Sequence, residues 1–251
     1  MADAGVKPLI ESRKYQRLQA AGRAKCSRQK GRRKFMTDLE MLKYVDHTQL
    51  KAFAAWDDIQ ELCKEAVEYK TASVCIPPCY VSRAHKEFPG LNICTVVGFP
   101  LGYSVTEAKV LETEKAIADG ASEVDMVVNI SDVKNGDYQK VEAEIARLKK
   151  AAGEKILKVI VETCYLTEKE KIAMCEAVTA AGADYIKTST GFGTAGANLE
   201  DIELFKKHIG PNVKIKAAGG VRTLEDLRAY IEAGCSRVGA SAAVKLAAGK
   251  K

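Results

Sequence analysis

The sequence lacks the features that mark membrane-inserted or exported proteins. No apolar stretch approaches the roughly 18 residues that a membrane-spanning helix needs. The first thirty residues are basic and carry no apolar signal-peptide core. With 47% apolar and 29% charged residues over 251 positions, the chain also does not match disordered or collagen-like proteins. This composition predicts a soluble globular protein with one large domain or two small ones.

Cysteine pairs of the kind that bind structural metals are also missing. The eight cysteines form no Cys-x-x-Cys pair, and none lies near a histidine at zinc-ligand spacing. Cys75 and Cys79 are four residues apart, but Pro77 and Pro78 between them exclude a helix that would place both thiols on one face. We therefore interpret the cysteines as buried, reduced thiols of a cytoplasmic protein.

Acidic residues are scarce at the start of the chain, where most of the net charge of +6 is concentrated. Residues 1–35 hold eleven Lys or Arg against Asp3 and Glu11, a net charge of +9, which leaves −3 for residues 36–251. The segment shows no clear apolar period, so we expect a weakly ordered basic extension followed by one domain over residues 36–251. A targeting presequence and a nucleic-acid-binding tail are the alternatives for this extension.

After Met36, eight short β-branched or apolar segments alternate with stretches of helical periodicity. Each strand-and-helix cycle takes about 27 residues, which is typical of parallel strands joined by crossover helices. The repeat predicts an α/β fold, a single-domain (β/α)8 TIM barrel, with its chemistry at the carboxyl ends of the strands. The strands are expected at residues 43–46, 72–76, 92–97, 123–128, 155–161, 184–187, 214–217 and 237–239, and the helices are expected to begin near residues 57, 82, 106, 137, 167, 199, 224 and 241.

Several helix boundaries carry their own sequence signals. Residues 104–107 (Ser-Val-Thr-Glu) and 167–170 (Thr-Glu-Lys-Glu) match the capping box, in which a hydroxyl and a glutamate satisfy free amides at a helix start. Thr37 is expected to cap a short helix over residues 38–42. Four helices are expected to end at glycines, namely Gly120, Gly153, Gly182 and Gly234.

Ionisable residues are rare in the expected strands, and the few present are informative. Asp125 lies in the fourth strand, Lys187 ends the sixth, and Lys214 and Lys216 share one face of the seventh. Two ammonium groups held together in a site of low dielectric constant lower the pKa of one of them, and a neutral amine can attack a carbonyl. Asp125 can keep the second lysine charged and transfer protons. This pattern predicts Schiff-base catalysis, although spacing alone does not choose between Lys214 and Lys216.

Two glycine-containing loops predict a phosphate site. Residues 218–223 (Ala-Gly-Gly-Val-Arg-Thr) follow the seventh strand, and residues 238–241 (Val-Gly-Ala-Ser) follow the eighth. Glycines let backbone amides approach an anion, and the loops after strands 7 and 8 are the usual phosphate site of a TIM barrel. The substrate is therefore expected to be a small phosphorylated carbonyl compound.

A third glycine motif, Gly-Phe-Gly-Thr-Ala-Gly at 191–196, matches a dinucleotide fingerprint. The next helix is expected only from about Asn198, and Lys216 stands where an acid should bind the ribose. We therefore expect no nicotinamide cofactor, and we expect this loop to close over the substrate beside Lys187.

In these segments the chain resembles the deoxyribose-phosphate aldolases, class I aldolases of the DeoC type, over about residues 39–246. The resemblance is carried by Tyr-Val-Asp-His-Thr at 44–48, Ser-Val-Cys-Ile-Pro-Pro at 73–78, Val-Val-Gly-Phe-Pro-Leu-Gly at 96–102, Glu-Val-Asp-Met-Val-Val-Asn at 123–129, Val-Glu-Thr-Cys-Tyr-Leu at 161–166, Tyr-Ile-Lys-Thr-Ser-Thr-Gly at 185–191, Lys-Ala-Ala-Gly-Gly-Val-Arg-Thr at 216–223 and Arg-Val-Gly-Ala-Ser at 237–241.

The resemblance implies reversible cleavage of 2-deoxy-D-ribose 5-phosphate to acetaldehyde and D-glyceraldehyde 3-phosphate, without metal or cofactor. It implies that Lys187 forms the Schiff base and that Asp125 and Lys216 exchange protons, which selects Lys216 over Lys214. A cytoplasmic homodimer or higher homo-oligomer is expected, with no membrane or nucleic-acid partner. The substrate and its phosphate are expected at Asp46, Thr48, Gly191, Gly219, Gly220, Val221, Arg222, Gly239 and Ser241.

Two features depart from the family pattern. Family members often end in a tyrosine that assists proton transfer, whereas the last tyrosine here is Tyr230, so turnover without that step is expected to be slower. The basic extension is the second departure. A runner-up on the same fold is a phosphosugar isomerase or synthase that uses Asp125 and Glu162 as acid and base without a covalent intermediate.

Overall fold

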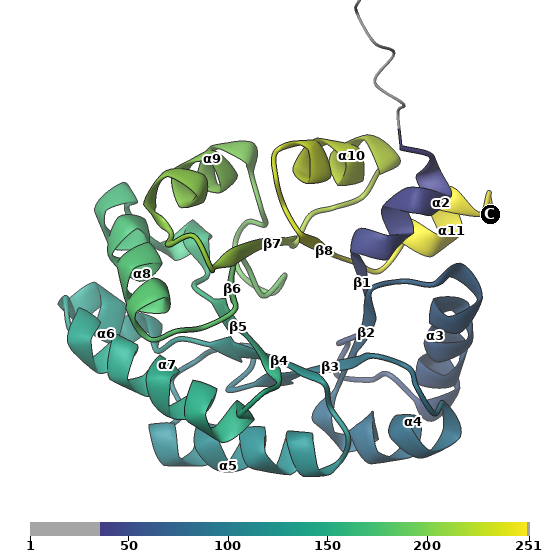
Figure 1. The fold of residues 1–251 in the computed structure, drawn as a ribbon, viewed down its shortest axis with the longest axis horizontal. Helices are drawn as coiled ribbons and strands as arrows, with labels where there is room; N and C mark the ends of the chain where they lie inside the picture. The colour runs from purple at the N-terminus through teal and green to yellow at the C-terminus, as the bar shows by residue number, and fades with distance from the viewer. Residues whose placement is uncertain (1–35, 250–251) are drawn as a thin grey trace, which may run out of the picture. The chain divides into compact units, whose positions relative to one another are not determined.

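In the computed structural model, eight parallel strands close into a barrel. The structure describes residues 36–249, so the extension expected over residues 1–35 lies outside the described residues. Each strand is hydrogen bonded to the next in chain order, and β8 pairs with β1 (Figure 1). The predicted TIM barrel is confirmed. The strands are β1 Val45–Thr48, β2 Ser73–Ile76, β3 Ile93–Val97, β4 Glu123–Val127, β5 Ile156–Ile160, β6 Tyr185–Lys187, β7 Lys214–Ala218 and β8 Arg237–Ala240.

Helices surround the strand ring and cover its outer face (Figure 1). Most begin within about two residues of the expected positions, but α6, which follows β4, was not predicted. The helical segments are α2 Asp38–Met41, η1 Leu42–Tyr44, α3 Trp56–Tyr69, η2 Pro78–Tyr80, α4 Val81–Glu87, α5 Thr106–Ala118, α6 Ile130–Asn135, α7 Tyr138–Ala152, η3 Thr163–Tyr165, α8 Glu168–Ala180, α9 Leu199–His208, α10 Leu224–Glu232 and α11 Ala243–Ala247.

The strands consist mainly of β-branched and other apolar residues because a barrel buries both of their faces. β3 and β4 are buried along their whole length. Inward and outward side chains alternate along each strand, so Glu123 and Asp125, two residues apart in β4, point to the same side. Most charged residues of the strands are thereby collected inside the barrel, whereas Lys214 is exposed at the start of β7.

The first strand begins two residues later than expected. Residues 42–44 form the short 3-10 helix η1 instead of the start of the strand, and β1 runs from Val45 to Thr48. Asp46 and Thr48 therefore both belong to β1, which brings Thr48 to the carboxyl end of the barrel.

The cap signals were correct at one helix and wrong at another. Thr167 and Glu170 form the expected capping box at the start of α8. At α5 the cap position is Val105, without a side-chain bond, and Glu107 pairs with Arg147 at 2.8 Å instead of turning back to the helix start. The four glycines expected to end helices all have positive φ, as expected for residues that reverse the chain.

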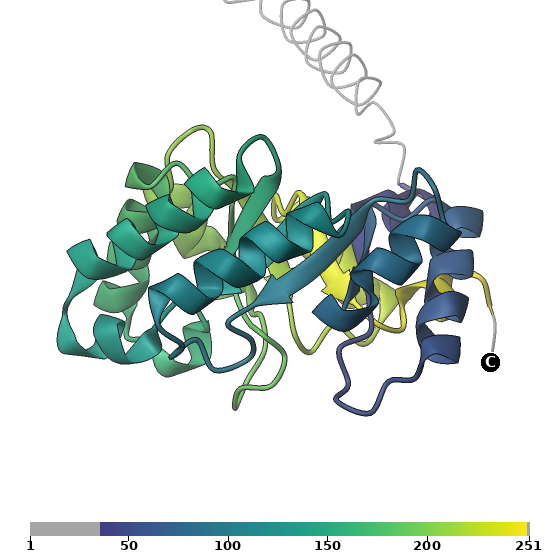
Figure 2. The ribbon, with the colours of Figure 1, turned by 90° about the horizontal axis from the view of Figure 1, so that it is seen from below.

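The loops at the carboxyl ends of the strands lie on one face. Figure 2 shows the loop after β1 and the loop after β6 extending from the same side of the barrel. Within residues 36–249, no helix is both long enough and apolar enough to cross a bilayer.

Candidate active site

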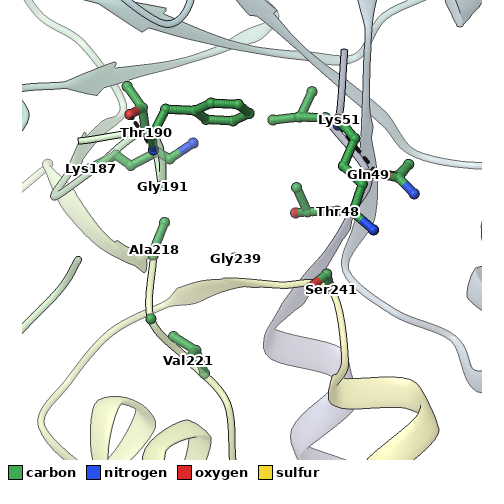
Figure 3. A pocket seen from close by; sticks show the side chains of 14 residues that line it. Thr48, Gln49, Lys51, Lys187, Thr190, Gly191, Ala218, Val221, Gly239 and Ser241 are labelled. Carbon is green, nitrogen blue, oxygen red and sulfur yellow. Dashed lines mark hydrogen bonds between the residues drawn. The ribbon is translucent and has the colours of Figure 1, made fainter. Parts of the chain in front are cut away.

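A cavity of about 240 Å³ opens at the carboxyl ends of β1, β6, β7 and β8. Figure 3 shows Lys187 and Thr190 on one side of it and Thr48 and Ser241 on the opposite side. Most of the residues predicted to bind substrate or phosphate lie here. The cavity is lined by Thr48, Gln49, Leu50, Lys51, Lys187, Thr190, Gly191, Phe192, Ala218, Gly219, Gly220, Val221, Gly239 and Ser241.

Lys187 connects this cavity to a buried ionic cluster beneath it. It is the last residue of β6 and is 3% exposed. Its ammonium group donates to Oδ2 of Asp125 at 2.8 Å. The side chain therefore reaches both the space for a substrate and a carboxylate.

Asp125 lies at the centre of the cluster. Its Oδ2 accepts hydrogen bonds from Lys187 and from Lys216 at 2.7 Å. Its Oδ1 accepts from Lys158 at 2.9 Å and from the Cys94 thiol at 3.1 Å. Burial by itself would raise the pKa of Asp125, but the three lysines outweigh it and hold the pKa well below its usual value. The carboxylate is therefore charged at neutral pH.

Lys216 is a direct neighbour of Lys187 in the paired strands β6 and β7. It also forms an ion pair with Asp46, whereas Lys214 is exposed at the start of β7. Burial favours the neutral form of Lys216, yet Asp125 and Asp46 outweigh it and raise the pKa of this lysine. Lys187 and Lys216 bond to the same oxygen, which confirms that two ammonium groups meet at this end of the barrel. The structure also places Lys216, and not Lys214, in the cluster.

Lys158 is the main member of the cluster that the sequence reasoning missed. It lies in β5 between two buried apolar residues and is fully buried. Its ammonium group contacts Glu123 Oε2 at 2.6 Å in addition to Asp125. Burial would lower the pKa of Lys158, but Asp125 and the neighbouring acids raise it well above its usual value. A lysine inside an apolar strand is the same signal that singled out Asp125.

Asp46 lies below the cavity and does not line it. Its Oδ1 accepts hydrogen bonds from Ser73 at 2.8 Å and from Arg237 at 2.7 Å. Burial opposes ionisation of Asp46, but Lys216, Lys158 and Arg237 lower its pKa. In this structure Asp46 is a partner of Lys216 and Arg237, whereas Thr48, two residues along β1, faces the cavity.

Among residues 36–249, thiols and carboxylates come close together in two groups that have the donors of a metal site. They are Cys75, Cys94 and Asp125, and Asp46, Cys94 and Glu123. Lys158 already contacts Cys94, Asp125 and Glu123 with its ammonium group at 3.3, 2.9 and 2.6 Å. A metal ion would have to displace this buried cation, so the donor set fits a lysine better than a divalent metal.

The glycine loop after β7 has the conformation expected for an anion site. Gly219 and Gly220 have φ of +81° and +77°, which only glycine adopts readily. Arg222 is exposed and does not line the cavity, and its backbone amide donates to Asp226 at 3.1 Å. The backbone and Ser241 are thus nearer to the cavity than the arginine side chain.

The motif at 191–196 does not open a helix. α9 begins at Leu199, as expected, and the Asn198 side chain caps it. A side chain at Gly196 would lie 2.2 Å from the Gly219 carbonyl oxygen, so this glycine is required for the contact between two loops. Gly191 and Phe192 line the cavity beside Lys187, where this loop was expected.

Glu162, the second acid of the alternative isomerase mechanism, makes its contacts elsewhere. Its carboxylate accepts from the backbone amide of Thr190, at 3.2 Å to each oxygen. Asp125 is bonded to three lysines and a thiol instead. The described contacts therefore do not join Asp125 and Glu162 into an acid–base pair.

The sequence matches the DeoC/LacD family of aldolases over residues 40–249. The chain belongs to this family. Curated relatives named deoxyribose-phosphate aldolase include one from Clostridium botulinum (strain Alaska E43 / Type E3), 67% identical over 86% of this chain and 98% of the relative. Another, from Clostridioides difficile (strain 630), is 60% identical over 82% of this chain and 94% of the relative.

Solved structures described as aldolases share the fold. A protein described as "QR15, an Aldolase" is 38% identical with a TM-score of 0.80, covering 83% of this chain and 95% of its own. The deoxyribose phosphate aldolase from Aeropyrum pernix, described as having a unique tetrameric structure, is 29% identical with a TM-score of 0.76, covering 84% and 91%.

Proposed function

We propose that this DeoC/LacD aldolase reversibly cleaves 2-deoxy-D-ribose 5-phosphate into acetaldehyde and D-glyceraldehyde 3-phosphate through a Schiff base on Lys187. The observation that carries the proposal is the position of Lys187, which lines the cavity and bonds to Asp125 in the cluster below it. The relatives named deoxyribose-phosphate aldolase support the choice of substrate.

The contacts of the cluster single out Lys187 as the nucleophile. The cluster holds four basic groups and three acids. Asp125 and Asp46 form ion pairs with Lys216, and Lys158 is buried against Asp125, Glu123 and the Cys94 thiol. Lys187 is the lysine of the cluster that reaches the cavity. The basic groups are Lys158, Lys187, Lys216 and Arg237, and the acids are Asp46, Glu123 and Asp125.

The first chemical step is attack of neutral Lys187 on the C1 aldehyde of the open-chain sugar. Loss of water leaves a protonated imine, which withdraws the electron pair of the C2–C3 bond as that bond breaks. Asp125 accepts the proton of the C3 hydroxyl, and Lys216 beside it exchanges protons with the same carboxylate oxygen. The enamine left on Lys187 is then protonated at carbon and hydrolysed, which releases acetaldehyde and restores the amine.

The phosphate of the substrate is proposed to bind at the glycine loops. Gly219, Gly220 and Val221 after β7, and Gly239 and Ser241 around the end of β8, line the same cavity as Lys187. Backbone amides and a hydroxyl at this position favour an anion. Thr48 and Gly191 are proposed to border the sugar. Arg222 is proposed to attract the phosphate through its positive charge from the edge of the cavity. Asp46 is proposed to act by holding the ammonium group of Lys216.

Borohydride trapping tests the Schiff base directly. Reduction in the presence of acetaldehyde should attach an ethyl group to the peptide that bears Lys187, because the imine is reduced to a stable amine. The exposed Lys214 in the same digest is the internal control and should stay unmodified. An unmodified Lys187 peptide in active enzyme would overturn the covalent mechanism, and labelling should disappear in Lys187→Met.

We also propose a cytoplasmic homo-oligomer. The tetrameric description of the Aeropyrum pernix enzyme supports oligomerisation, as do four exposed large apolar residues within residues 101–111. The described cysteines are all free thiols, which fits a reducing compartment. Light scattering of the purified full chain measures the state, and a monomer at micromolar concentration would contradict the proposal. The apolar residues are Leu101, Tyr103, Val105 and Leu111.

A further inference from the structure

Glu162 differs from every other buried carboxylate in the described part of the chain. It is 2% exposed and has no basic group within 4.0 Å, whereas the other buried Asp and Glu residues of this part each contact a Lys, Arg or His. It also has a left-handed backbone, with φ of 53° and ψ of 66°. Such a conformation is unfavourable for a residue with a side chain, so it points to a specific role.

The unusual backbone arises from a bulge between β5 and β6. The Val161 amide donates to the Lys187 carbonyl at 3.0 Å, and the Thr163 amide donates to the very next carbonyl, that of Thr188, at 2.9 Å. One residue is therefore extra on the β5 side, and that residue is Glu162. Bulges redirect side chains, and this one turns the carboxylate toward the loop that follows Lys187.

The carboxylate of Glu162 organises the first residues of that loop, which spans residues 188–198. Both oxygens accept from the Thr190 amide at 3.2 Å, and Oε2 also accepts from the Thr190 hydroxyl. The Thr190 hydroxyl oxygen in turn accepts from the Phe192 amide at 3.0 Å. Thr190, Gly191 and Phe192 all line the cavity.

The far end of the same loop is packed against the glycine loop after β7. The Ala197 amide donates to the carbonyls of Ala218 and Gly219, both at 3.1 Å. Gly196 contacts Gly219 so closely that a side chain at 196 would collide with the carbonyl group. The position of Gly219 is therefore coupled, through residues 190–197, to the carboxylate of Glu162.

We propose that Glu162 is a positioning residue for phosphate recognition. Through Thr190 it holds the 188–198 loop against Gly219. The glycine loop after β7 is thereby kept in the conformation that binds a phosphomonoester. The inference rests on the proposed aldolase activity and assigns a residue that gives this enzyme its preference for phosphorylated over unphosphorylated 2-deoxyribose. The Schiff-base chemistry itself does not use the carboxylate of Glu162.

The test compares two substrates on one variant. Glu162→Gln keeps the size of the side chain but removes its charge and replaces one acceptor oxygen with an NH2 donor. In either orientation of the amide this donor faces the Thr190 backbone amide, which now bonds to both oxygens. We expect KM for 2-deoxyribose 5-phosphate to rise about tenfold with little change in kcat, since bonds to a charged group are lost. For unphosphorylated 2-deoxyribose, kcat/KM should stay within about twofold.

A second pair of variants does not depend on the folding of Glu162→Gln. Thr190→Val removes the hydroxyl and should reproduce the loss of preference for the phosphorylated substrate. Thr190→Ser keeps the hydroxyl and should retain the wild-type preference. The double variant Glu162→Gln/Thr190→Val should lose no more than either single variant, because both act on one contact.

Glu170→Gln is the matched control. Glu170 accepts from the amide and hydroxyl of Thr167, at 2.7 and 2.9 Å, in the same way as Glu162 does from Thr190, but at the start of α8. The Glu170→Gln variant should leave the preference for phosphorylated over unphosphorylated 2-deoxyribose unchanged. Equal losses on both substrates in Glu162→Gln and Thr190→Val would overturn the positioning role. A wild-type enzyme inactive on both substrates would instead refute the proposed function.

Discussion

The single carboxylate of Asp125 bonds to three lysines, and its two oxygens have different partners. Oδ1 faces Lys158 and the Cys94 thiol, and Oδ2 faces Lys187 and Lys216. Because Lys158 holds one oxygen, the other is directed at the two lysines of the proposed reaction. Lys158 thus orients the proton-transferring group without lining the cavity.

Removing Lys158 should be strongly destabilising. Lys158→Met leaves Asp125 and Glu123 buried with one cation fewer, and we expect the free energy of unfolding to fall by about 3–5 kcal/mol. Urea denaturation measures this. Lys206→Met is the control, since the exposed Lys206–Glu203 pair is expected to contribute about 0–1 kcal/mol. Similar losses in the two variants would show that the buried cluster is not a special source of stability.

His47 should make stability fall in mildly acidic solution. It is 1% exposed, its Nε2 lies 2.8 Å from Glu65, and burial lowers its pKa despite that carboxylate. Between the lowered folded pKa and the unfolded value near 6.5, the unfolded chain binds more protons. The stability associated with neutral His47 is therefore present above about pH 6.5 and is lost as the pH falls toward the folded pKa.

The measurement is the free energy of unfolding in urea at pH 7.5 and pH 5. His47→Gln, which cannot take up a proton, should lose less stability over this interval than the wild type. The exposed His208 provides a substitution control, because His208→Gln makes the same change at a surface position. An identical pH dependence in wild type and His47→Gln would contradict the role of His47.

At the level of single elements, the apolar pattern predicted all eight strands to within about two residues, because burial on both faces leaves little freedom in their composition. The 3-10 turn before β1 and helix α6 were missed, since both are short and follow local geometry more than periodicity. Lys158 could have been found from its place in an apolar strand. Arg237 and Glu123 lie at strand starts, where a charged residue normally faces solvent, and only the closed barrel shows their contact.

The two capping-box motifs of the sequence should contribute differently to the free energy of unfolding. Thr167→Ala should destabilise the protein by about 1 kcal/mol, because the hydroxyl bonds to the Glu170 amide at the start of α8. Ser104→Ala should change stability by less than about 0.5 kcal/mol, since Val105 occupies the cap position of α5. Thermal unfolding of both variants checks this pair. A larger loss for Ser104→Ala would mean that α5 begins earlier in solution.

The whole barrel is needed to assemble the site, because its parts come from strands that are not neighbours. Asp46, Asp125 and Lys216 belong to β1, β4 and β7, and Asp125 and Lys216 are 91 positions apart in the chain. The sequence indicated which residue types end the strands, but not which side chains meet across the interior. The closed barrel and the register of its strands determine which side chains meet. They place Lys187 beside Lys216 and direct both toward Asp125.

The same architecture predicts that residues 1–35 are dispensable for catalysis. The family match begins at residue 40, the first strand begins at Val45, and the first described helix is capped by Thr37 and tied to α10 by the Asp38–Arg228 ion pair at 2.9 Å. A chain starting at Met36 keeps all of these contacts, so its kcat/KM should lie within about twofold of the full chain.

Any salt-sensitive affinity for nucleic acid should disappear with the same truncation, because the residues that remain carry a net charge of −3. Parallel aldolase assays and nucleic-acid titrations at two salt concentrations separate the two roles. If the truncated enzyme folded but lost aldolase activity, the extension would have to be part of the active molecule and the domain boundary near residue 36 would be wrong.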